Sequence, residues 1–460
     1  MRLVIDLQGA QSESRYRGIG RYSLSLARAI AENRGDHEII VALSGLFPDS
    51  IKPLKNIFKE VIPEENIRVW NAPGPVCEYD TDNQWRRTAA EIIREAFLES
   101  LDPDLVFISS FMEGFADNTV SSIGRFSADV TTAVTLYDLI PLVNPKEYLE
   151  RSKLFRDHYM RKIEDLKKAD GLLAISEYSA MEGIEKLGLE KSRVINISSA
   201  CDDVFQIIDP GESDVLDRYG ISKPFVMYTG GADSRKNLSA LLSAYSKLPE
   251  YLKNSHQIVI VGKLKKAQIE YLKIVAMSLG LDTHDLVLTG YVSDRDLVEL
   301  YNLCELFVFP SWHEGFGLPA LEAINCGAPV IGSNTSSLPE VIGIADALFD
   351  PYDPEDISDK MLRTLTDTHF RRTLTDRQSE HAKNFDWNIS AKKALSFFEE
   401  IVSGEKSPLL SKRSAVIEKL VSKIAAITEA LPSDNDLRSA AAAISFNHPK
   451  NEDKSGKNER

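Results

Sequence analysis

Two glutamates that flank a glycine-bearing segment are the residues best suited to chemistry. Glu314 and Glu322 have seven residues between them, beginning with Gly315-Phe316-Gly317-Leu318. A buried strand is expected to end at Pro310 and a helix to begin with Pro319, because proline suits the first helical position, where its missing N–H has no partner. The free N–H groups and dipole of a helix start favour an anion, and glycines let it approach the backbone. The pattern predicts a diphosphate site.

The two acids are expected to have different targets. Glu314 precedes the helix and is expected to point into a cleft, whereas Glu322 lies about one turn inside the helix and is placed to reach a ribose. Ionised carboxylates accept hydrogen bonds from sugar hydroxyls, so both positions suit a sugar ligand. The alternative is a helix with an acidic first turn and a glycine hinge. We interpret His313 as a packing or supporting residue rather than a base.

A second polar segment, Gly230–Asn237, follows a predicted strand and precedes a predicted helix. Its candidate ligands are Gly231, Arg235 and Lys236. The adjacent cations can neutralise a leaving diphosphate, for which each hydrogen-bond donor contributes roughly 10²–10³ in rate. The alternative is a solvated turn in which Asn237 caps the following helix.

Strand-like runs alternate with helical patterns, which predicts an α/β fold with parallel sheets covered on both faces. In the first half, strands are expected at 3–7, 38–43, 105–109, 131–136 and 171–175, with helices at 85–99 and 151–168. The pattern restarts after about residue 205, with strands at 225–229, 257–261, 286–288, 306–309 and 329–331 and a helix at 238–248. Two successive units of similar size predict two Rossmann-like domains that face each other across a cleft.

Composition excludes several classes of protein. A chain of 460 residues, 43% hydrophobic and 27% charged, suits two soluble domains plus an extension. Its net charge of −15 repels nucleic acid, and no basic patch interleaved with aromatics offsets it. The four cysteines are scattered, which argues against a disulfide framework or a zinc site and favours the cytoplasm.

Membrane and metal signals are weak. Strand-like sequence from Arg2 leaves no room for a signal peptide, and no apolar run approaches the ~20 residues of a membrane helix, so membrane association would be peripheral. The Asp294-Arg295-Asp296 segment resembles a metal-binding Asp-x-Asp, but it follows Ser293 and opens an apolar-periodic helix. We therefore interpret it as a helix start stabilised by capping and by the helix dipole.

The C-terminal part is expected to be helical and then disordered. Residues 387–402 form an amphipathic pattern, and residues 415–431 place Val416, Leu420, Ile424, Ile427 and Leu431 at helical spacing. The last dozen residues are almost entirely polar. The tail helix either packs against its own domain, forms an oligomer, or links to a partner or second module.

The motifs together resemble a known family. The paired glutamates, the Arg-Lys-Asn at 235–237 and Gly290-Tyr291-Val292 before a helix are similar to the family-4 retaining glycosyltransferases of GT-B fold, over residues 1 to about 403. The opening Ile5–Gln11, Arg17–Tyr22 and Tyr137–Leu142 most resemble bacterial mannosyltransferases that build polymannose O-antigens. Those proteins often carry two or more transferase modules in tandem, and this chain resembles a single N-terminal module with a following linker.

The resemblance implies a domain plan. Residues 1–204 would form the acceptor-side domain and residues 205–386 the donor-binding domain, with a linker at 201–214. The helix at 387–403 would cross back to the first domain, and residues 404–460 would form a helical tail or linker with a disordered end.

The resemblance also implies residue roles. Arg235 and Lys236 would grip the donor diphosphate, Glu314 would hold hydroxyls of the transferred sugar, and Glu322 would bind the ribose. The backbone of Gly315, Phe316, Gly317 and Leu318 would meet sugar and phosphate, and Val292 would line the base pocket. Gly18 and Gly20 would bring the first-domain loop to the phosphates.

One position departs from the family pattern. Many relatives carry a histidine where this chain has Tyr137. The resemblance implies that this histidine contacts the reacting sugar in those relatives. Asp138 therefore becomes the catalytic candidate of the first domain, although a polar residue at a strand end also suits a turn.

The implied reaction is transfer of mannose from GDP-mannose to a mannan or O-antigen acceptor on a lipid carrier, with retained configuration. No metal is required, because Arg235, Lys236 and the helix start supply positive charge. The implied partners are a nucleotide-sugar, a lipid-linked glycan, and a further transferase module or membrane-associated assembly partner. The alternatives are a UDP-sugar-dependent enzyme of the same fold and a non-catalytic scaffolding module.

Overall fold

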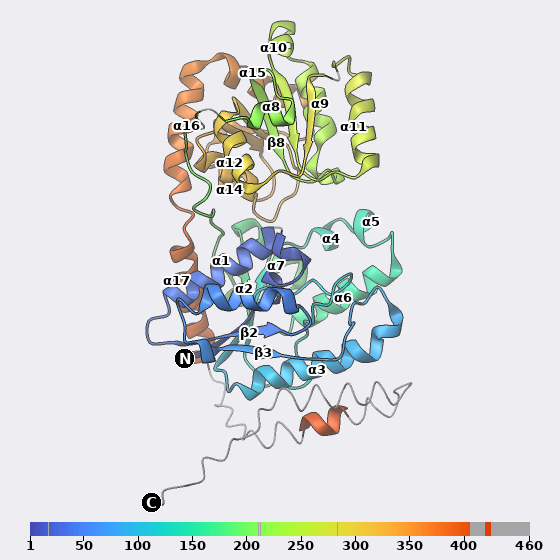
Figure 1. Cartoon of the computed structure of the whole chain (residues 1–460), viewed down its shortest axis with the longest axis vertical. Helices are drawn as coiled ribbons and strands as arrows, with labels where there is room; N and C mark the ends of the chain where they lie inside the picture. The colour runs from blue at the N-terminus through green and yellow to red at the C-terminus, as the bar shows by residue number, and fades with distance from the viewer. Residues whose placement is uncertain (17, 210, 212, 283, 405–418, 425–460) are drawn as a thin grey trace, which may run out of the picture.

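A computed structural model of the protein describes residues 1–404 and 419–424, apart from residues 17, 210, 212 and 283. In this part of the chain two parallel sheets, each covered by helices, form two domains stacked along the long axis of the molecule (Figure 1). The predicted pair of Rossmann-like domains is thereby confirmed.

The sheet of the first domain contains, within the described residues, seven parallel strands in the order β3-β2-β1-β4-β5-β6-β7. They are β1 (Arg2–Asp6), β2 (Glu38–Ser44), β3 (Ile67–Trp70), β4 (Leu105–Ile108), β5 (Thr132–Leu136), β6 (Gly171–Ala174) and β7 (Val194–Asn196). The order reverses between β1 and β4, and in open α/β sheets ligands bind outside the carboxyl ends of strands at such a reversal.

The second sheet contains, within the same limits, six parallel strands in the order β10-β9-β8-β11-β12-β13. They are β8 (Phe225–Thr229), β9 (Gln257–Val261), β10 (Leu286–Gly290), β11 (Leu306–Phe309), β12 (Val330–Ser333) and β13 (Leu348–Phe349). Here the order reverses between β8 and β11. These strands lead into the segment that holds Arg235 and Lys236 and into the segment that holds Glu314, respectively.

Helices cover both sheets. Those of the first domain are α1 (Gly18–Glu32), α2 (Pro48–Phe58), α3 (Gln84–Ser100), α4 (Ile140–Val143), α5 (Pro145–Tyr148), α6 (Lys153–Leu166) and α7 (Glu177–Leu187). Those of the second are α8 (Val215–Tyr219), α9 (Leu238–Ser246), α10 (Glu250–Ser255), α11 (Lys266–Ser278), α12 (Asp294–Leu303), α13 (Leu318–Asn325), α14 (Leu338–Ile342), α15 (Pro354–Thr366) and α16 (Thr368–Ala382), followed by α17 (Trp387–Ser403).

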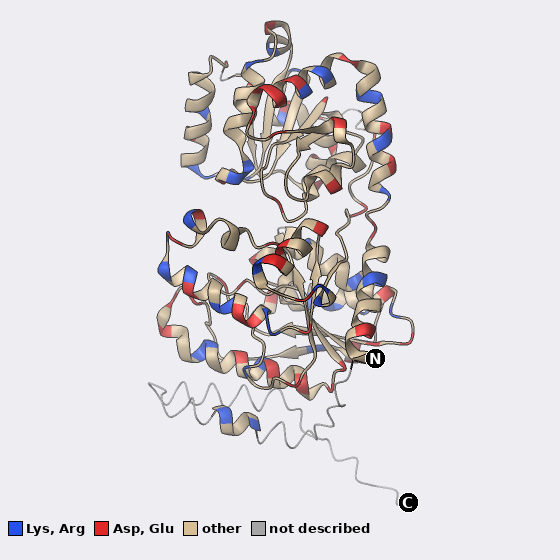
Figure 2. Ribbon diagram, turned by 180° about the vertical axis from the view of Figure 1, so that it is seen from behind, with Lys and Arg blue, Asp and Glu red and all other residues tan. Residues whose placement is uncertain are grey.

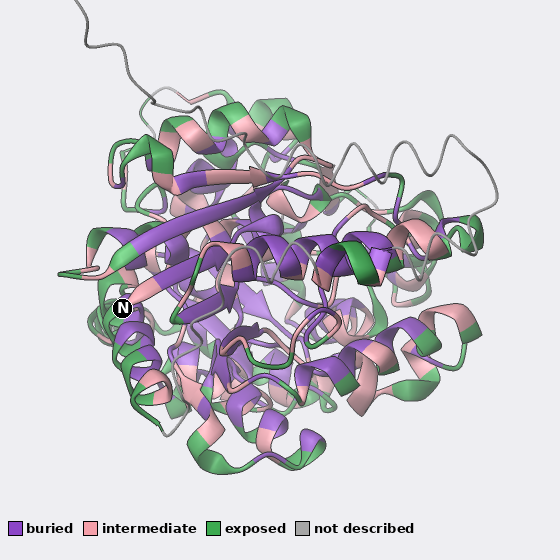
Figure 3. Cartoon of the chain, turned by 90° about the horizontal axis from the view of Figure 1, so that it is seen from below, coloured by how far each residue is buried: buried purple, intermediate pink, exposed green. Residues whose placement is uncertain are grey.

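The central strands are buried on both faces, as is usual in parallel sheets. In β1, Leu3 and Ile5 belong to one apolar cluster and Val4 to another on the opposite face, and each is fully buried. Seen from below, buried strands of the first domain lie inside a layer of helices that expose their outer faces (Figure 3). This packing fixes the strand ends from which the site loops emerge.

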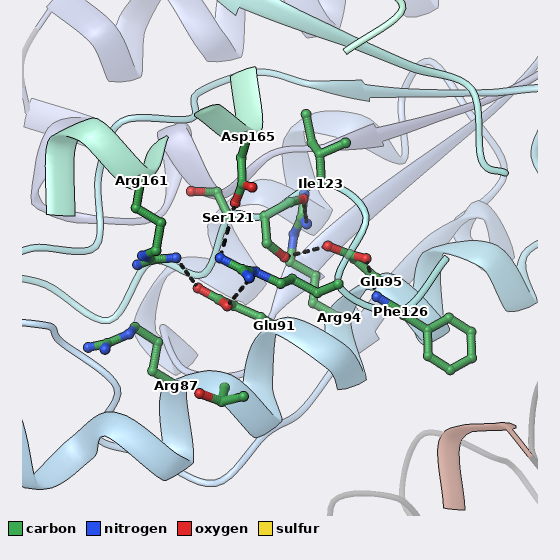
Figure 4. A network of polar contacts seen from close by, with 12 residues as sticks. Arg87, Glu91, Arg94, Glu95, Ser121, Ile123, Phe126, Arg161 and Asp165 are labelled. Atoms are coloured by element: carbon green, nitrogen blue, oxygen red, sulfur yellow. Dashed lines mark hydrogen bonds and ion pairs between the residues drawn. The ribbon is translucent and has the colours of Figure 1, made fainter. Parts of the chain in front are cut away.

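A buried ionic network anchors the carboxyl end of β1. Arg94 of α3 contacts Asp6, with Nε and Nη2 each 2.6 Å from Oδ2. Gln8 donates to both carboxylate oxygens of Asp6 and to the carbonyl of Val120 at 2.7 Å. Figure 4 shows Arg94 among the neighbouring acids and arginines of α3 and α6, including Glu91 paired with Arg161 at 2.8 Å. The polar residues after β1 thus hold the loop that leads to α1.

Within the described residues, the chain passes between the two domains twice. Residues 197–214, as far as they are described, contain no helix or strand and connect the domains once. The chain returns at α17, where the Trp387 ring lies 5.2 Å from that of Tyr22 in α1 and Phe398 packs 5.3 Å from Phe107 in β4. α17 therefore packs on the first domain although it follows the second.

A short part of the tail is described. Residues 419–424 are helical, and Leu420 and Ile424 are buried in a small apolar cluster that includes Ile93 of α3 and Phe126. Lys423 Nζ donates to the carbonyl of Arg125 at 2.8 Å. This part packs against the first domain. The rest of the predicted helix at 415–431, and the predicted disordered end, lie outside the described residues.

The surface is charged with both signs. Lys and Arg are interspersed with Asp and Glu over the outer helices of both domains (Figure 2). In the described ranges, no helix combines the length and the apolar character needed to cross a membrane.

Candidate functional site

The segment between β11 and α13 is one wall of the candidate site. Gly317 caps α13 in the left-handed region at φ 111°, which favours glycine, and the helix begins at Leu318 rather than at the predicted Pro319. Proline occupies the second position, where its missing N–H again costs nothing. Among the residues described, the N–H groups of 315–318 have no hydrogen-bond acceptor. The helix start is thus able to bind an anion.

Glu314 lies between the two cations predicted to bind diphosphate. Its carboxylate accepts from Lys236 Nζ at 2.6 Å and from Arg235 Nη1 at 2.8 Å, and the residue is only 7% exposed. Burial would raise the pKa of this carboxyl, but Lys236 and Arg235 lower it to about 2. Arg235 also donates to the carbonyl of His313 at 2.9 Å. The sequence places these residues in two segments, and the fold joins them into one charged cluster.

Glu322 has a different environment. It is buried in α13, accepts from the Tyr301 hydroxyl at 3.1 Å and lies 3.9 Å from Arg21 of the first domain. Burial raises the pKa of Glu322 to about 7, against the opposing effects of Arg21 and Tyr301. Arg21 also pairs with Asp294 at the start of α12. Arg21 was not among the predicted site residues, because its partner Asp294 lies 273 positions away in the sequence and Glu322 lies farther still.

The Asp294–Asp296 segment is a helix start, as the sequence predicts. The Ser293 side chain accepts from the N–H of Asp296 at 3.1 Å, and both acids lie in the first turn of α12. Among the described residues, no three His, Cys, Asp or Glu side chains group closely enough to hold a metal ion.

The first domain contributes the start of α1. A Cβ at Gly18 would lie 3.4 Å from Leu318, so the first residues of α1 and α13 meet across the domain boundary. Gly20 faces its own domain instead, because a Cβ there would lie 2.2 Å from the Cα of Arg15 in the preceding segment. Gly20 therefore permits close packing within the first domain, and Gly18 is the glycine that faces the second.

Asp138 follows β5 and also borders the donor-side loop. A Cβ at Gly315 would lie 2.5 Å from the carbonyl oxygen of Tyr137 and 3.3 Å from the Cβ of Asp138, so only glycine fits at 315. Asp138 Oδ1 accepts from the N–H of Ile140, which is the turn role considered from the sequence. Burial raises the pKa of Asp138, and the charge of Arg235 opposes the rise. The carboxyl is thus near the charged cluster but serves a turn as well.

Three further candidates are placed by the backbone or the core rather than by an exposed side chain. Val292 is 7% exposed and belongs to the main apolar cluster, whereas its neighbour Tyr291 is 75% exposed. Phe316 packs its ring 5.5 Å from Phe385, so only its backbone can meet a ligand. The carbonyl of Gly231 accepts from the Tyr228 hydroxyl at 2.9 Å.

Helix α7 lies on the side of the first domain that faces the second domain (Figure 1), and it contacts the loop around Glu314. Ser179 Oγ lies 3.0 Å from the carbonyl oxygen of Gly315. His313 Nε2 lies 3.0 Å from Glu182, and both side chains are buried. These contacts agree with the supporting role predicted for His313. Sequence analysis missed Ser179 and Glu182, because the amphipathic pattern of a helix does not indicate which loop of another domain it contacts.

Comparison with known proteins adds family information to this geometry. The family described as glycosyl transferases group 1 matches residues 218–384. The serotype-specific mannosyltransferase WbdA of Escherichia coli is 38% identical over 431 residues, 91% of this chain and 51% of the relative. The O-antigen chain mannosyltransferase B of Escherichia coli is 34% identical over 259 residues, 55% of this chain and 67% of the relative.

The chain spans about half the length of the WbdA proteins that it matches. Among solved structures, Anabaena Alr3699/HepE in complex with UDP and glucose aligns with a TM-score of 0.62 at 16% identity, covering 87% of this chain and all of that one. At this identity the likeness concerns the fold, and it confirms the predicted GT-B arrangement.

Proposed function

Because this chain belongs to the group 1 glycosyltransferases, we propose that it transfers mannose from GDP-mannose to a mannan or O-antigen acceptor, with retention of anomeric configuration. The observation that carries the proposal is the 38% identity to a serotype-specific mannosyltransferase over 431 residues, 91% of this chain. The charged cluster of Glu314, Arg235 and Lys236 supports a donor that contains a diphosphate. So does the contact between the starts of α1 and α13.

In the proposed complex the diphosphate lies between the starts of α1 and α13. Gly18, Gly231 and the N–H groups of 315–318 line it, and Arg235 and Lys236 neutralise its charge. Glu322 accepts hydrogen bonds from the ribose hydroxyls, and Val292 packs behind the base. Glu314 holds hydroxyls of the mannose, and Asp138 faces the same sugar from the first domain.

The reaction proceeds on one face of the sugar. The bond from C1 to the diphosphate oxygen breaks as the bond from C1 to the acceptor oxygen forms, and the acceptor proton passes to the leaving phosphate oxygen. The carboxylate of Glu314 is bound by two cations, an arrangement that supports an orienting role rather than nucleophilic attack. The protein contributes charge neutralisation, orientation and exclusion of water.

The positive charge at the phosphates comes from Arg235, Lys236 and two helix starts, so the proposed reaction uses no metal or other cofactor. The proposed acceptor is a glycan on a lipid carrier, reached by a protein in the cytoplasm that is peripheral to the inner membrane. The WbdA relatives are about twice as long as the matched region, which supports a further transferase module or a membrane-associated assembly partner.

The test is incubation with a panel of nucleotide-sugars and a short synthetic mannoside, followed by linkage analysis of the product. Mannose transfer from GDP-mannose with α-configuration, insensitive to a metal chelator, is the expected result. Glu314→Ala should abolish it while circular dichroism remains that of the parent. Full activity in that variant would exclude the proposed site.

Two alternatives have distinct outcomes in the same experiment. Binding and turnover of a UDP-sugar, with no response to GDP-mannose, would identify a UDP-dependent enzyme of the same fold. Failure to bind any nucleotide-sugar would identify a scaffolding module. The ion pairs of Glu314 with Arg235 and Lys236 favour the enzyme, because an unused site has no reason to retain three buried charges.

A further inference from the structure

The hydroxyl of Tyr137 is directed at α1 rather than at the donor-side loop. It lies 3.0 Å from Ser23 Oγ in α1 and donates to the carbonyl of Ser109, just after β4, at 3.0 Å. It also lies 3.3 Å from the carbonyl oxygen of Ile19 in the first turn of α1. One side-chain oxygen at the end of β5 thus connects β5, the end of β4 and the start of α1.

The ring of Tyr137 completes this connection. It packs edge-on against Tyr22 of α1 at 5.3 Å, and Tyr22 in turn packs against Trp387 of α17 at 5.2 Å. Burial raises the pKa of Tyr137 well above its ordinary value, so its hydroxyl keeps its proton at neutral pH and is able to donate a hydrogen bond.

The turn that Tyr137 holds is the part of the first domain that meets the donor site. Gly18 faces Leu318 at the start of α13, and Arg21 reaches Asp294 and Glu322. A small rotation of this turn would move both residues at once, because they lie on the same helical turn.

We propose that Tyr137 is a positioning residue whose hydroxyl fixes the first turn of α1 against the diphosphate end of the donor site and does not contact the transferred sugar. This inference rests on the proposed function for the identity of the ligand. In this account Tyr137 affects phosphate binding indirectly, by positioning α1. The polar contacts to the sugar are made by Glu314 and Asp138.

The test is Tyr137→Phe, which removes the hydroxyl and keeps the ring. Binding of guanosine, GDP and GDP-mannose is measured by calorimetry in parent and variant. The affinities for GDP and GDP-mannose should fall by the same factor, about five- to tenfold for one hydrogen-bonding group. Guanosine affinity should fall less than GDP affinity, because guanosine reaches this turn only through the contact of Glu322 with Arg21. A loss confined to GDP-mannose would overturn the proposal, because it would place the hydroxyl on the sugar.

A second measurement requires no ligand. Hydrogen exchange of the amides of residues 19–24 should be faster in Tyr137→Phe than in the parent. The matched control is Tyr245→Phe in the second domain, which removes a buried hydroxyl that donates to the carbonyl of His256 at 3.0 Å. The control should leave exchange in α1 unchanged. Unchanged exchange in Tyr137→Phe would overturn the positioning role.

The two proposals fail in different ways. If the parent binds neither GDP nor GDP-mannose, the proposed function is wrong, whereas the exchange measurement still decides whether Tyr137 holds α1. Ser23→Ala, alone and combined with Tyr137→Phe, extends the test. Because the two hydroxyls contact each other, their effects on exchange in α1 should be less than additive. Strict additivity would contradict a shared connection.

Discussion

Lys236 Nζ lies 2.6 Å from Glu314 Oε1, and both side chains are almost fully removed from solvent. A cation proposed for the diphosphate is therefore already bound to the acid proposed for the sugar. Arg235 is bound to the other oxygen of the same carboxylate. The proposed diphosphate would share this positive charge with the carboxylate, and this sharing determines the sign of the first two predictions.

Glu314→Gln should slow transfer about 10²- to 10³-fold, the scale for losing one preorganised polar contact in a transition state. The same change should tighten GDP binding, because Arg235 and Lys236 no longer neutralise a neighbouring carboxylate. Initial rates with GDP-mannose and calorimetry with GDP measure the two effects. Glu99→Gln, a buried acid of α3, is the control and should alter neither. Weaker GDP binding by Glu314→Gln would contradict the shared-charge account.

Lys236→Met should weaken GDP binding at least tenfold and destabilise the protein by about 3 kcal/mol, because it leaves a buried carboxylate with one partner fewer. The double variant Lys236→Met/Glu314→Gln should recover much of that stability, since the remaining Arg235 then pairs with Asp233, 3.1 Å away, and no buried carboxylate at this site lacks a partner. Urea denaturation of the four proteins in the cycle measures the coupling. Additive losses of stability would show that the pair is not coupled.

Donor affinity should increase with pH near neutrality. Burial raises the pKa of Glu322 from 4.5 to about 7, so the carboxyl ionises only as pH rises through about 7. Only the ionised form would accept hydrogen bonds from both ribose hydroxyls. The stability linked to this group has the opposite sign: it is fully present below about pH 4.5 and is lost as pH rises through about 7. GDP titrations between pH 5.5 and 8.5 measure the affinity.

Two variants separate Glu322 from other groups in this titration. Glu322→Gln should make GDP affinity independent of pH in this range. Glu340, whose pKa burial also raises to about 7, lies in α14 and accepts from the N–H of Glu177. Glu340→Gln should therefore retain the pH dependence. If Glu340→Gln removed the pH dependence and Glu322→Gln kept it, the titrating group would be Glu340, at the contact between α14 and Glu177 of the first domain.

Arg21→Met should move the midpoint of the affinity profile to higher pH. Arg21 favours the ionised form of Glu322, so its removal raises the pKa of that acid further. GDP affinity should fall at pH 7 and recover in part at pH 8.5. Arg28→Met is the control, because Arg28 lies on the same helix and pairs only with Glu32 among the described acids. An equal loss at both pH values would indicate a direct phosphate contact by Arg21.

Leu420→Ala and Ile424→Ala should each destabilise the protein by about 2 kcal/mol, the lower end of the range for a buried aliphatic side chain. Both side chains are buried against the first domain, whereas Val421 between them is 51% exposed. Val421→Ala should therefore have little effect. Denaturant titrations of the three variants are the measurement, and equal effects would contradict the packing of the tail segment.

The sequence predicts the central strands well and misses some edge strands. β8 and β9 begin and end where the apolar runs predict, because their burial on both faces leaves a continuous hydrophobic signal. β3 and β7 are short edge strands without such a run, and each forms by pairing with one neighbour, β2 and β6 respectively. Local pattern therefore identifies the central strands and the apolar edge strand β10, but not the edge strands β3 and β7.

The site shows a similar division. Glu314 and Glu322 are recognisable because the chain presents them around one helix start, and Arg235 and Lys236 because they follow one strand. The pairing of Arg235 with Glu314 joins residues 79 positions apart, and no local pattern specifies it. The contact of Ser179 with Gly315 spans 136 positions and depends on how the domains meet. Tyr137 departs from the family pattern in the sequence, but only the fold reveals where its hydroxyl is directed.

The two passages of the chain between the domains restrict how the domains can move. Two covalent connections permit rotation about the line that joins them and oppose sliding or twisting. The second connection ends at Trp387, against Tyr22 of α1. An axis of opening along this line would pass close to the helix whose first turn meets the start of α13. Because points near a rotation axis move least, such a rotation would keep those two helix starts close together while the far sides of the domains separate.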